Sequence, residues 1–284
     1  MANMHLAIYG YLRKLAQNKK RVFVMLYALR AAYLLCHFMA VCVFALGYCL
    51  IKPRHRNATT KLASMMSWAL PWLGIQFQAK NPLPLGQDQQ AVFVVNHQDT
   101  LDIFICTAML PPNIAILGKN QLKYVPIFGL SFWLAGNIFI DRDNKAKAWD
   151  TMASVARKVK RRRCSLYMFP EGTRSQGKGL LPFKSGAFAL AVQSGLPIVP
   201  IVFSSTHKNV DLNKLRAGVV LAEHLDPIAT HGLGEADIKP LMELTRQRMQ
   251  AAQTRLDQEA SLLAQSQAHK YSLSEQIHRY LKSR

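Results

Sequence analysis

A histidine and two aspartates separate two apolar runs in the stretch at residues 94–104, which reads VVNHQDTLDIF. The first run predicts a strand, and the second predicts a helix that begins near Thr100. An aspartate in the first turn of such a helix can accept the Nδ1–H of a histidine in the preceding loop, which leaves Nε2 free to act as a base. We therefore predict a general-base dyad of His97 and Asp102. Asp99 could compete as the partner of His97, but we expect it to cap the helix.

Basic side chains follow the ends of other predicted strands. Lys119 and Arg142 each lie in such a loop, and Arg174 lies in FPEGTRS at residues 169–175. Guanidinium groups bind phosphate through two parallel hydrogen bonds, and Gly172 lets the backbone approach a ligand. Each cation alone also fits an ordinary surface loop, and the histidine and aspartate spacing alone also fits a helix cap beside an unrelated histidine. Their convergence at strand ends predicts a site for a phosphorylated substrate.

Short apolar runs alternate with helical patterns from residue 90 onward. This alternation predicts an α/β fold, with a mixed, largely parallel sheet flanked by helices on both faces. Helices are expected at residues 144–160, where Asn144 is the cap, at residues 183–194, where Gly195 ends the helix, and from residue 235 to about 267. The predicted strands cover residues 91–95, 114–117, 137–140, 165–169, 197–203 and 218–223.

An apolar segment from Ala31 to Ile51 is about as long as a helix needs to be to cross a membrane. Basic residues flank it on both sides, so it fits a helix lying in an anionic leaflet as well as a spanning one. A buried core helix is the alternative. The stretch from Thr59 to Phe77 is read as a second amphipathic helix, which belongs at the membrane interface or packs on the core.

The composition points to an anionic partner. Thirty-six Lys and Arg residues against sixteen Asp and Glu give a formal net charge of +20. The sequence has no zinc-finger or RNA-binding motif, so we expect no nucleic-acid partner. The five cysteines form no metal-ligand pattern, and we expect them to be reduced and no metal to be bound. The basic run KVKRRR at residues 158–163 fits a solvated helix end or a surface that attracts acidic partners.

Four motifs occur in one order along the chain: NHQDTLD, LGKNQLKYVPIFG with GNIFIDR, FPEGTRS and LPIVPI. Together they resemble the motifs of the glycerolipid acyltransferase family, and the resemblance extends from about Leu26 into the 220s. That family often has Ser where this chain has Asp99.

The resemblance implies acyl transfer from acyl carrier protein or coenzyme A thioesters to the sn-2 hydroxyl of lysophosphatidic acid, which gives phosphatidic acid. His97 would be the base and Asp102 its orienting partner, and no cofactor would be needed. The substrate-binding residues would be Lys119, Arg142, Glu171, Gly172 and Arg174.

The same resemblance implies a place at the bacterial inner membrane, with the site on the cytoplasmic side. Another lysophospholipid or glycerol-3-phosphate acyltransferase, or a non-catalytic lipid-binding protein, remains an alternative. We divide the chain into an N-terminal extension (1–24), a membrane-associating helical region (25–80), the acyltransferase domain (81–230) and a C-terminal amphipathic helix with a tail (231–284).

Overall fold

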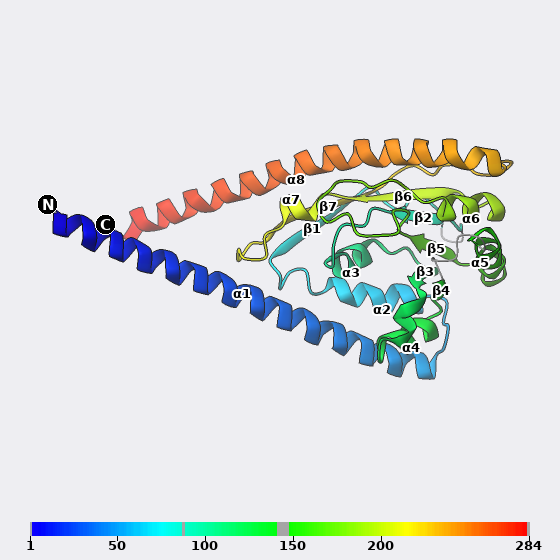
Figure 1. The fold of residues 1–284 in the computed structure, drawn as a ribbon, viewed down its shortest axis with the longest axis horizontal. Helices are drawn as coiled ribbons and strands as arrows, with labels where there is room; N and C mark the ends of the chain where they lie inside the picture. The colour runs from blue at the N-terminus through cyan, green and yellow to red at the C-terminus, as the bar shows by residue number, and fades with distance from the viewer. Residues whose placement is uncertain (1, 87–88, 141–147, 283–284) are drawn as a thin grey trace.

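One mixed sheet of seven strands organises the part of the chain that the computed structural model describes, which is residues 2–86, 89–140 and 148–282 (Figure 1). Side chains are described for residues 24–86, 89–140 and 149–266. In spatial order the strands are β1 (Ile75–Lys80), β7 (Gly218–His224), β6 (Ile198–Phe203), β2 (Val92–Val95), β5 (Ser165–Met168), β3 (Ile114–Lys119) and β4 (Ile138–Ile140).

The strand directions bring four loops to one edge. β6, β2, β5, β3 and β4 are mutually parallel, whereas β7 pairs antiparallel with β6 and parallel with β1. The carboxyl ends of β2, β5, β3 and β4 therefore meet at the same side of the sheet. That side is where a doubly covered sheet presents its ligand-binding loops.

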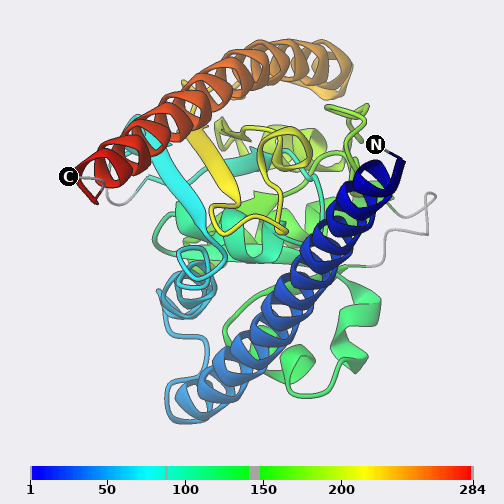
Figure 2. The ribbon, with the colours of Figure 1, turned by 90° about the vertical axis from the view of Figure 1, so that its left-hand side faces the viewer.

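Alternate residues of each central strand enter different cores. Val92 and Val94 face the core formed with α5 (Ala148–Arg162), α6 (Gly186–Ser194) and α8 (Ile238–Lys282). Phe93 and Val95 face the core formed with α1 (Ala2–Ile51), α2 (Ala58–Ser67) and α3 (Asp102–Ile105). Burial on both faces explains why these strands are continuously apolar. In Figures 1 and 2, α8 and α1 cross opposite sides of the sheet.

Shorter helices complete the described elements. They are α4 (Phe128–Leu134), α7 (Thr206–Asn209) and the 3-10 turns at Cys106–Met109, Asn120–Tyr124 and Glu235–Asp237. Gly195 ends α6 in the left-handed conformation, with φ of +68°, as predicted from its position. Asn144 lies outside the described residues.

The sequence prediction was wrong over residues 59–77. The helix expected there ends at Ser67, and Ile75–Lys80 forms the edge strand β1. Gly74 separates the two elements with φ of +71°, and a Cβ atom there would collide with the carbonyl oxygen of Leu215. Glycine fits this position because the backbone of a distant loop occupies the space that a side chain would need. The C-terminal helix, in turn, extends beyond the expected residue 267 to Lys282.

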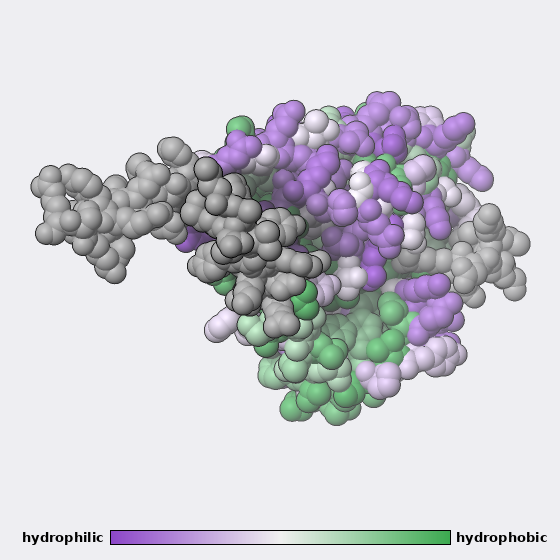
Figure 3. Space-filling view, turned by 60° about the vertical axis from the view of Figure 1, so that its left-hand side comes forward, coloured by the Kyte–Doolittle hydropathy of each residue, from purple (hydrophilic) through white to green (hydrophobic). Residues whose placement is uncertain are grey.

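α1 is a single helix, and the expected boundary at residue 24 falls inside it. Its part from Val24 to Ile51 is long and apolar enough to cross a membrane, which is weak evidence for membrane association. Figure 3 shows apolar surface gathered on the side of α1, α2 and α4. Large apolar side chains exposed on these elements and the turn after α2 include Phe44, Leu50, Ile51, Trp68, Trp72, Leu130 and Trp133.

Arg30 joins α1 to the loop before β7. Its side chain is buried, and its guanidinium donates hydrogen bonds to the carbonyl oxygens of Leu212 (2.6 Å), Lys214 (2.6 Å) and Leu215 (2.8 Å). A buried guanidinium is tolerated only where its donors have partners. The loop carbonyls supply these partners, so α1 and the loop depend on each other.

We predict that Arg30→Ala exposes this loop to trypsin after Lys214 and Arg216. Hydrogen bonds from a charged donor contribute about 1.5–3 kcal/mol each, so losing three should raise local opening and cleavage at least about tenfold. Cleavage is measured by mass spectrometry of timed digests. Arg54→Ala is the control, because Arg54 contacts the Trp133 ring rather than the loop. Equal cleavage of the two variants would contradict a clamping role for Arg30.

Candidate active site

His97 and Asp102 are in contact at the carboxyl end of β2. His97 Nδ1 lies 2.7 Å from Asp102 Oδ2, and the two side chains are 19% and 2% exposed. Asp102 is the first residue of α3, which places its carboxylate under the loop that holds the histidine. Among the described residues, His97 Nε2 has no hydrogen-bond partner. The geometry is that of a histidine whose outer nitrogen is available as a base.

Asp102 Oδ2 is also the acceptor for the loop backbone. The N–H groups of Gln98 and Asp99 donate to it at 2.6 Å and 3.2 Å. Because Asp102 Oδ2 already accepts these two N–H groups, it is an acceptor toward His97 as well. His97 Nδ1 therefore carries the proton of the hydrogen bond between His97 and Asp102. Burial raises the pKa of Asp102, while the hydrogen bond and charge of His97 and the Gln98 N–H oppose the rise.

Glu171 connects the loop after β5 to the loop after β2. Its buried carboxylate accepts the N–H of His97 at 2.7 Å through Oε1 and the N–H of Leu181 at 2.9 Å through Oε2. Burial raises the pKa of Glu171, and these backbone N–H groups oppose the rise. Both oxygens are therefore engaged in holding backbone. The predicted role in substrate binding is untested, but the structure gives Glu171 a positioning contact with the histidine.

Aromatic and backbone contacts hold the His97 ring. The Phe169 ring stacks on it, with centroids 4.1 Å apart and planes inclined by 23°. The carbonyl of His97 accepts the N–H of Ser175 at 2.8 Å. Asn96, one residue earlier, exchanges two hydrogen bonds of 2.9 Å with the backbone of Phe203 at the end of β6. The base is thus braced by both strands that flank β2.

Asp99 is not the N-cap residue of α3, which begins at Asp102. Its Oδ1 accepts the N–H of Leu101 at 2.7 Å, and its Oδ2 accepts the hydroxyl of Thr206 at 2.5 Å. Gln98 accepts the N–H of Thr206 as well, at 2.9 Å. The helix begins later than predicted, so Asp99 supports the turn before it and links that turn to α7.

Two of the predicted cations, Lys119 and Arg174, lie along the same edge. Lys119 is the exposed last residue of β3, the strand beside β5. The Arg174 guanidinium donates to the hydroxyl of Thr100 at 3.3 Å, in the loop between His97 and Asp102. Arg142 lies outside the described residues, two positions after β4 ends at Ile140. The structure therefore brings Arg174 to the dyad and places Lys119 two strands away from it.

Gly172 adopts φ of +70°, which glycine tolerates best. The sequence predicts that a ligand approaches its backbone. Instead, the side chain of Lys184 lies over it: a Cβ at Gly172 would come within 2.9 Å of Lys184 Cδ and Cε and 3.0 Å of Nζ. Neither this lysine nor the contacts of Glu171 with backbone N–H groups follow from the sequence pattern. A positive-φ glycine signals a close approach but does not say which residue approaches.

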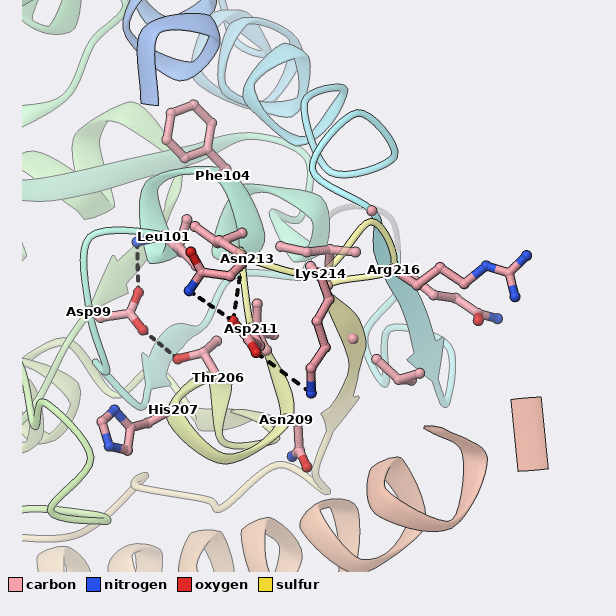
Figure 4. Close-up of a pocket in the computed structure, with 18 of the residues that line it drawn as sticks. Asp99, Leu101, Phe104, Thr206, His207, Asn209, Asp211, Asn213, Lys214 and Arg216 are labelled. Atoms are coloured by element: carbon pink, nitrogen blue, oxygen red, sulfur yellow. Dashed lines mark hydrogen bonds and ion pairs between the residues drawn. The ribbon is translucent and has the colours of Figure 1, made fainter. Parts of the chain in front are cut away.

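A large cavity of about 1990 Å³ opens beside the site (Figure 4). Asp99, Thr100 and Leu101 line it, so it reaches the loop of the dyad, although His97 itself is not in its lining. One wall is apolar and comes from α1 and α3, while the 206–217 segment supplies polar and charged groups. The apolar wall includes Leu34, Leu35, Phe38, Leu101, Ile103 and Phe104.

We predict that Glu171→Ala and Glu171→Gln both lower stability. Alanine leaves two partly buried N–H groups without acceptors, and glutamine turns its amide NH₂ toward one of them. At about 1–3 kcal/mol for each unsatisfied group, the alanine variant should lose about 2–5 kcal/mol and the glutamine variant less. Unfolding in detergent by denaturant measures both. The exposed Glu235→Gln is the control, and stability equal to the parent in both Glu171 variants would refute the brace.

Comparison with known proteins gives a consistent result. A model of the acyltransferase family matches residues 74–204. The chain is 37% identical over 237 residues to the 1-acyl-sn-glycerol-3-phosphate acyltransferases of Salmonella typhimurium and of Escherichia coli, covering 84% of this chain and 97% of each relative. It is 33% identical over 202 residues to the human 1-acyl-sn-glycerol-3-phosphate acyltransferase beta, covering 69% of this chain and 73% of that protein.

The fold has a solved counterpart. The crystal structure of the 1-acyl-sn-glycerophosphate acyltransferase from Thermotoga maritima superposes with a TM-score of 0.66 at 20% identity, covering 84% of this chain and 97% of that one. At that identity the likeness concerns the fold. The bacterial relatives, matched along nearly their whole length, show that this chain belongs to the acyltransferase family and is an enzyme of that family.

Proposed function

We propose that the protein transfers a fatty acyl group from a thioester of acyl carrier protein or coenzyme A to the sn-2 hydroxyl of lysophosphatidic acid. The observation that carries the proposal is the contact of 2.7 Å between His97 Nδ1 and Asp102 Oδ2, which leaves Nε2 available at the site. The choice of acceptor is supported by the names of the bacterial relatives.

The chemistry follows from the geometry of the dyad. His97 Nε2 takes the hydroxyl proton as the acceptor oxygen bonds to the thioester carbonyl carbon. The tetrahedral intermediate then breaks its carbon–sulfur bond, and the imidazolium returns the proton to the departing thiolate. Asp102 holds the ring and stabilises its charged form. The direct transfer balances without a covalent acyl-enzyme, a metal or another cofactor.

Cations at the sheet edge suit the acceptor's phosphate. Arg174 contacts the dyad loop, and Lys119 lies at the end of β3 on the same edge. Arg142 keeps its proposed role as a third phosphate ligand. Binding the phosphate away from the reacting hydroxyl would orient that hydroxyl against the base, which converts binding energy into rate.

The cavity beside the dyad loop suits acyl chains. Its wall on α1 and α3 is apolar, and it reaches residues 99–101. Transferring methylene groups from water to such a wall is favourable by about 0.8 kcal/mol each. We propose that one of the two lipid substrates places its acyl chain there.

The proposed location is the cytoplasmic face of the bacterial inner membrane. Apolar residues exposed on α1, α2 and α4 would contact lipid, and the net charge of +20 would favour an anionic leaflet. The same charge suits acyl carrier protein or coenzyme A, because carboxylates and phosphates make these donors anionic.

The first experiment follows transfer of a labelled oleoyl group from either donor to lysophosphatidic acid in detergent. We expect the parent to form phosphatidic acid and His97→Ala to lose about 10²–10⁴-fold in kcat, the usual contribution of a general base. His231→Ala is the control, because His231 is exposed in the loop between β7 and α8. An active His97→Ala would exclude the mechanism. A parent inactive with both donors would exclude the acceptor assignment.

Asp102→Asn tests the orienting role separately. Asparagine keeps the shape but lets its amide bind the wrong tautomer of His97, so kcat should fall by at least about 10²-fold. Kinetics on correctly folded variant, checked by circular dichroism, provide the measurement. Full activity would mean that Asp102 supports only the loop backbone.

Acceptor choice and regiochemistry need their own assay. Glycerol 3-phosphate and lysophosphatidylcholine are offered in place of lysophosphatidic acid, and phospholipase A2 releases label only from the sn-2 position. We expect preference for lysophosphatidic acid and release of nearly all the label. A preference for either competitor would identify a different member of the family.

A further inference from the structure

Lys184 lies over the turn after β5 that contacts His97, although it belongs to none of the motifs. Its backbone N–H donates to the carbonyl of Pro170 at 2.8 Å, which ties the chain before α6 to the turn after β5. Its side chain then crosses Gly172, with Cδ, Cε and Nζ all within 3.0 Å of the place that a Cβ would occupy. Any residue larger than glycine at position 172 would displace this lysine.

The turn that Lys184 covers is the one that holds His97. Phe169 stacks on the imidazole ring, Glu171 accepts the histidine N–H, and the N–H of Gly172 donates to the carbonyl of Phe169 at 3.1 Å. The ammonium group therefore rests on the turn whose residues contact His97. It is also at the surface, since Lys184 is exposed.

The acidic side chains that the structure describes do not explain the position of this cation. Within the described ranges, no carboxylate forms an ion pair with Lys184. Glu171 is the acidic residue of the turn, and both its oxygens accept backbone N–H groups. Both oxygens of Asp99 are likewise engaged. Packing and its backbone hold the ammonium against this turn, and no carboxylate in the described part of the chain compensates its charge.

We propose that Lys184 is a ligand of the acceptor's phosphate. The inference rests on the proposed function and adds a residue to the binding site. A phosphomonoester is a compact, largely dianionic group, and a lysine ammonium binds it as a point charge. Only a short carbon spacer separates this phosphate from the sn-2 hydroxyl. A cation one turn away from His97 is therefore placed to hold the phosphate while the hydroxyl faces Nε2.

The kinetic test compares Lys184→Ala, Lys184→Arg and the control Lys178→Ala. Lys178 is an exposed lysine of the neighbouring loop that contacts Ser175 only through its backbone N–H. We expect Lys184→Ala to raise KM for lysophosphatidic acid at least tenfold with the donor KM unchanged, and arginine to restore part of the loss. An unchanged acceptor KM, or a rise confined to the donor KM, would overturn the proposal.

A second measurement does not need turnover. Acetylation of Lys184 in the parent by an N-hydroxysuccinimide ester is followed by peptide mass spectrometry with glycerol 3-phosphate, inorganic phosphate or glycerol present. We expect glycerol 3-phosphate to slow the acetylation of Lys184 severalfold, inorganic phosphate to slow it less, and glycerol to have no effect. Lys178 should be acetylated at the same rate throughout.

The outcomes separate the two hypotheses. Protection by glycerol 3-phosphate without transfer to lysophosphatidic acid would support Lys184 as a phosphate ligand and refute the proposed reaction. Transfer without protection would leave the reaction standing and refute the role of Lys184. Equal protection by inorganic phosphate and glycerol 3-phosphate would also support it, because the ammonium would then contact the phosphate itself, whereas equal protection by glycerol would refute it.

Discussion

Glu171 ties the two loops that make the site into one unit. Its carboxylate spans from the backbone of His97 to that of Leu181, and it is buried between the ends of β2 and β5. A neutral glutamine could not replace it equally, because only one of the two polar atoms of an amide is an acceptor, whereas both oxygens of a carboxylate are. Burying it raises its pKa and costs solvation, and the two N–H groups offset that cost. The histidine, the stacked Phe169 and the Gly172 turn keep their relative places because this carboxylate is there.

The parallel sheet makes such a unit possible. Neighbouring strands β2, β5 and β3 run in the same direction, so their outgoing loops are stacked side by side at roughly the 4.8 Å strand spacing. A base on the first loop, a brace and a cation on the second and another cation on the third then lie along one edge of the sheet. The antiparallel pair β6 and β7 places α7 against the far side of the dyad loop, where Thr206 contacts Asp99.

Periodicity and motif spacing predicted much of this arrangement. The six strands after residue 90 and the pairing of His97 with Asp102 followed from apolar runs and from the position of a carboxylate in a first helical turn. The strand β1 was missed because Trp68 and Trp72 made residues 59–77 look like one apolar helix face. The close approach of Leu215 to Gly74 comes from a loop distant in sequence.

The contacts of Glu171 and Lys184 could not be foreseen for a similar reason. Each depends on how loops distant in sequence approach a turn, which local pattern does not encode. The Pro-Glu-Gly sequence predicts the turn itself, but it does not predict which residues pack against the turn. Arg142 and Asn144 lie outside the described residues, so their predicted roles stay predictions.

Arg30 fixes the rotational phase of α1. A helix that slides along its axis by one residue must turn by about 100° to present an equivalent side chain, which would carry Arg30 away from its three carbonyl partners. His37, farther along the helix, places its Nε2 atom 3.0 Å from the carbonyl oxygen of Met65, and this contact also restricts the rotation of α1. α1 can therefore neither roll nor slide independently of the sheet. Whatever surface its outer face rests on, the orientation of the catalytic edge relative to that surface is set by this helix.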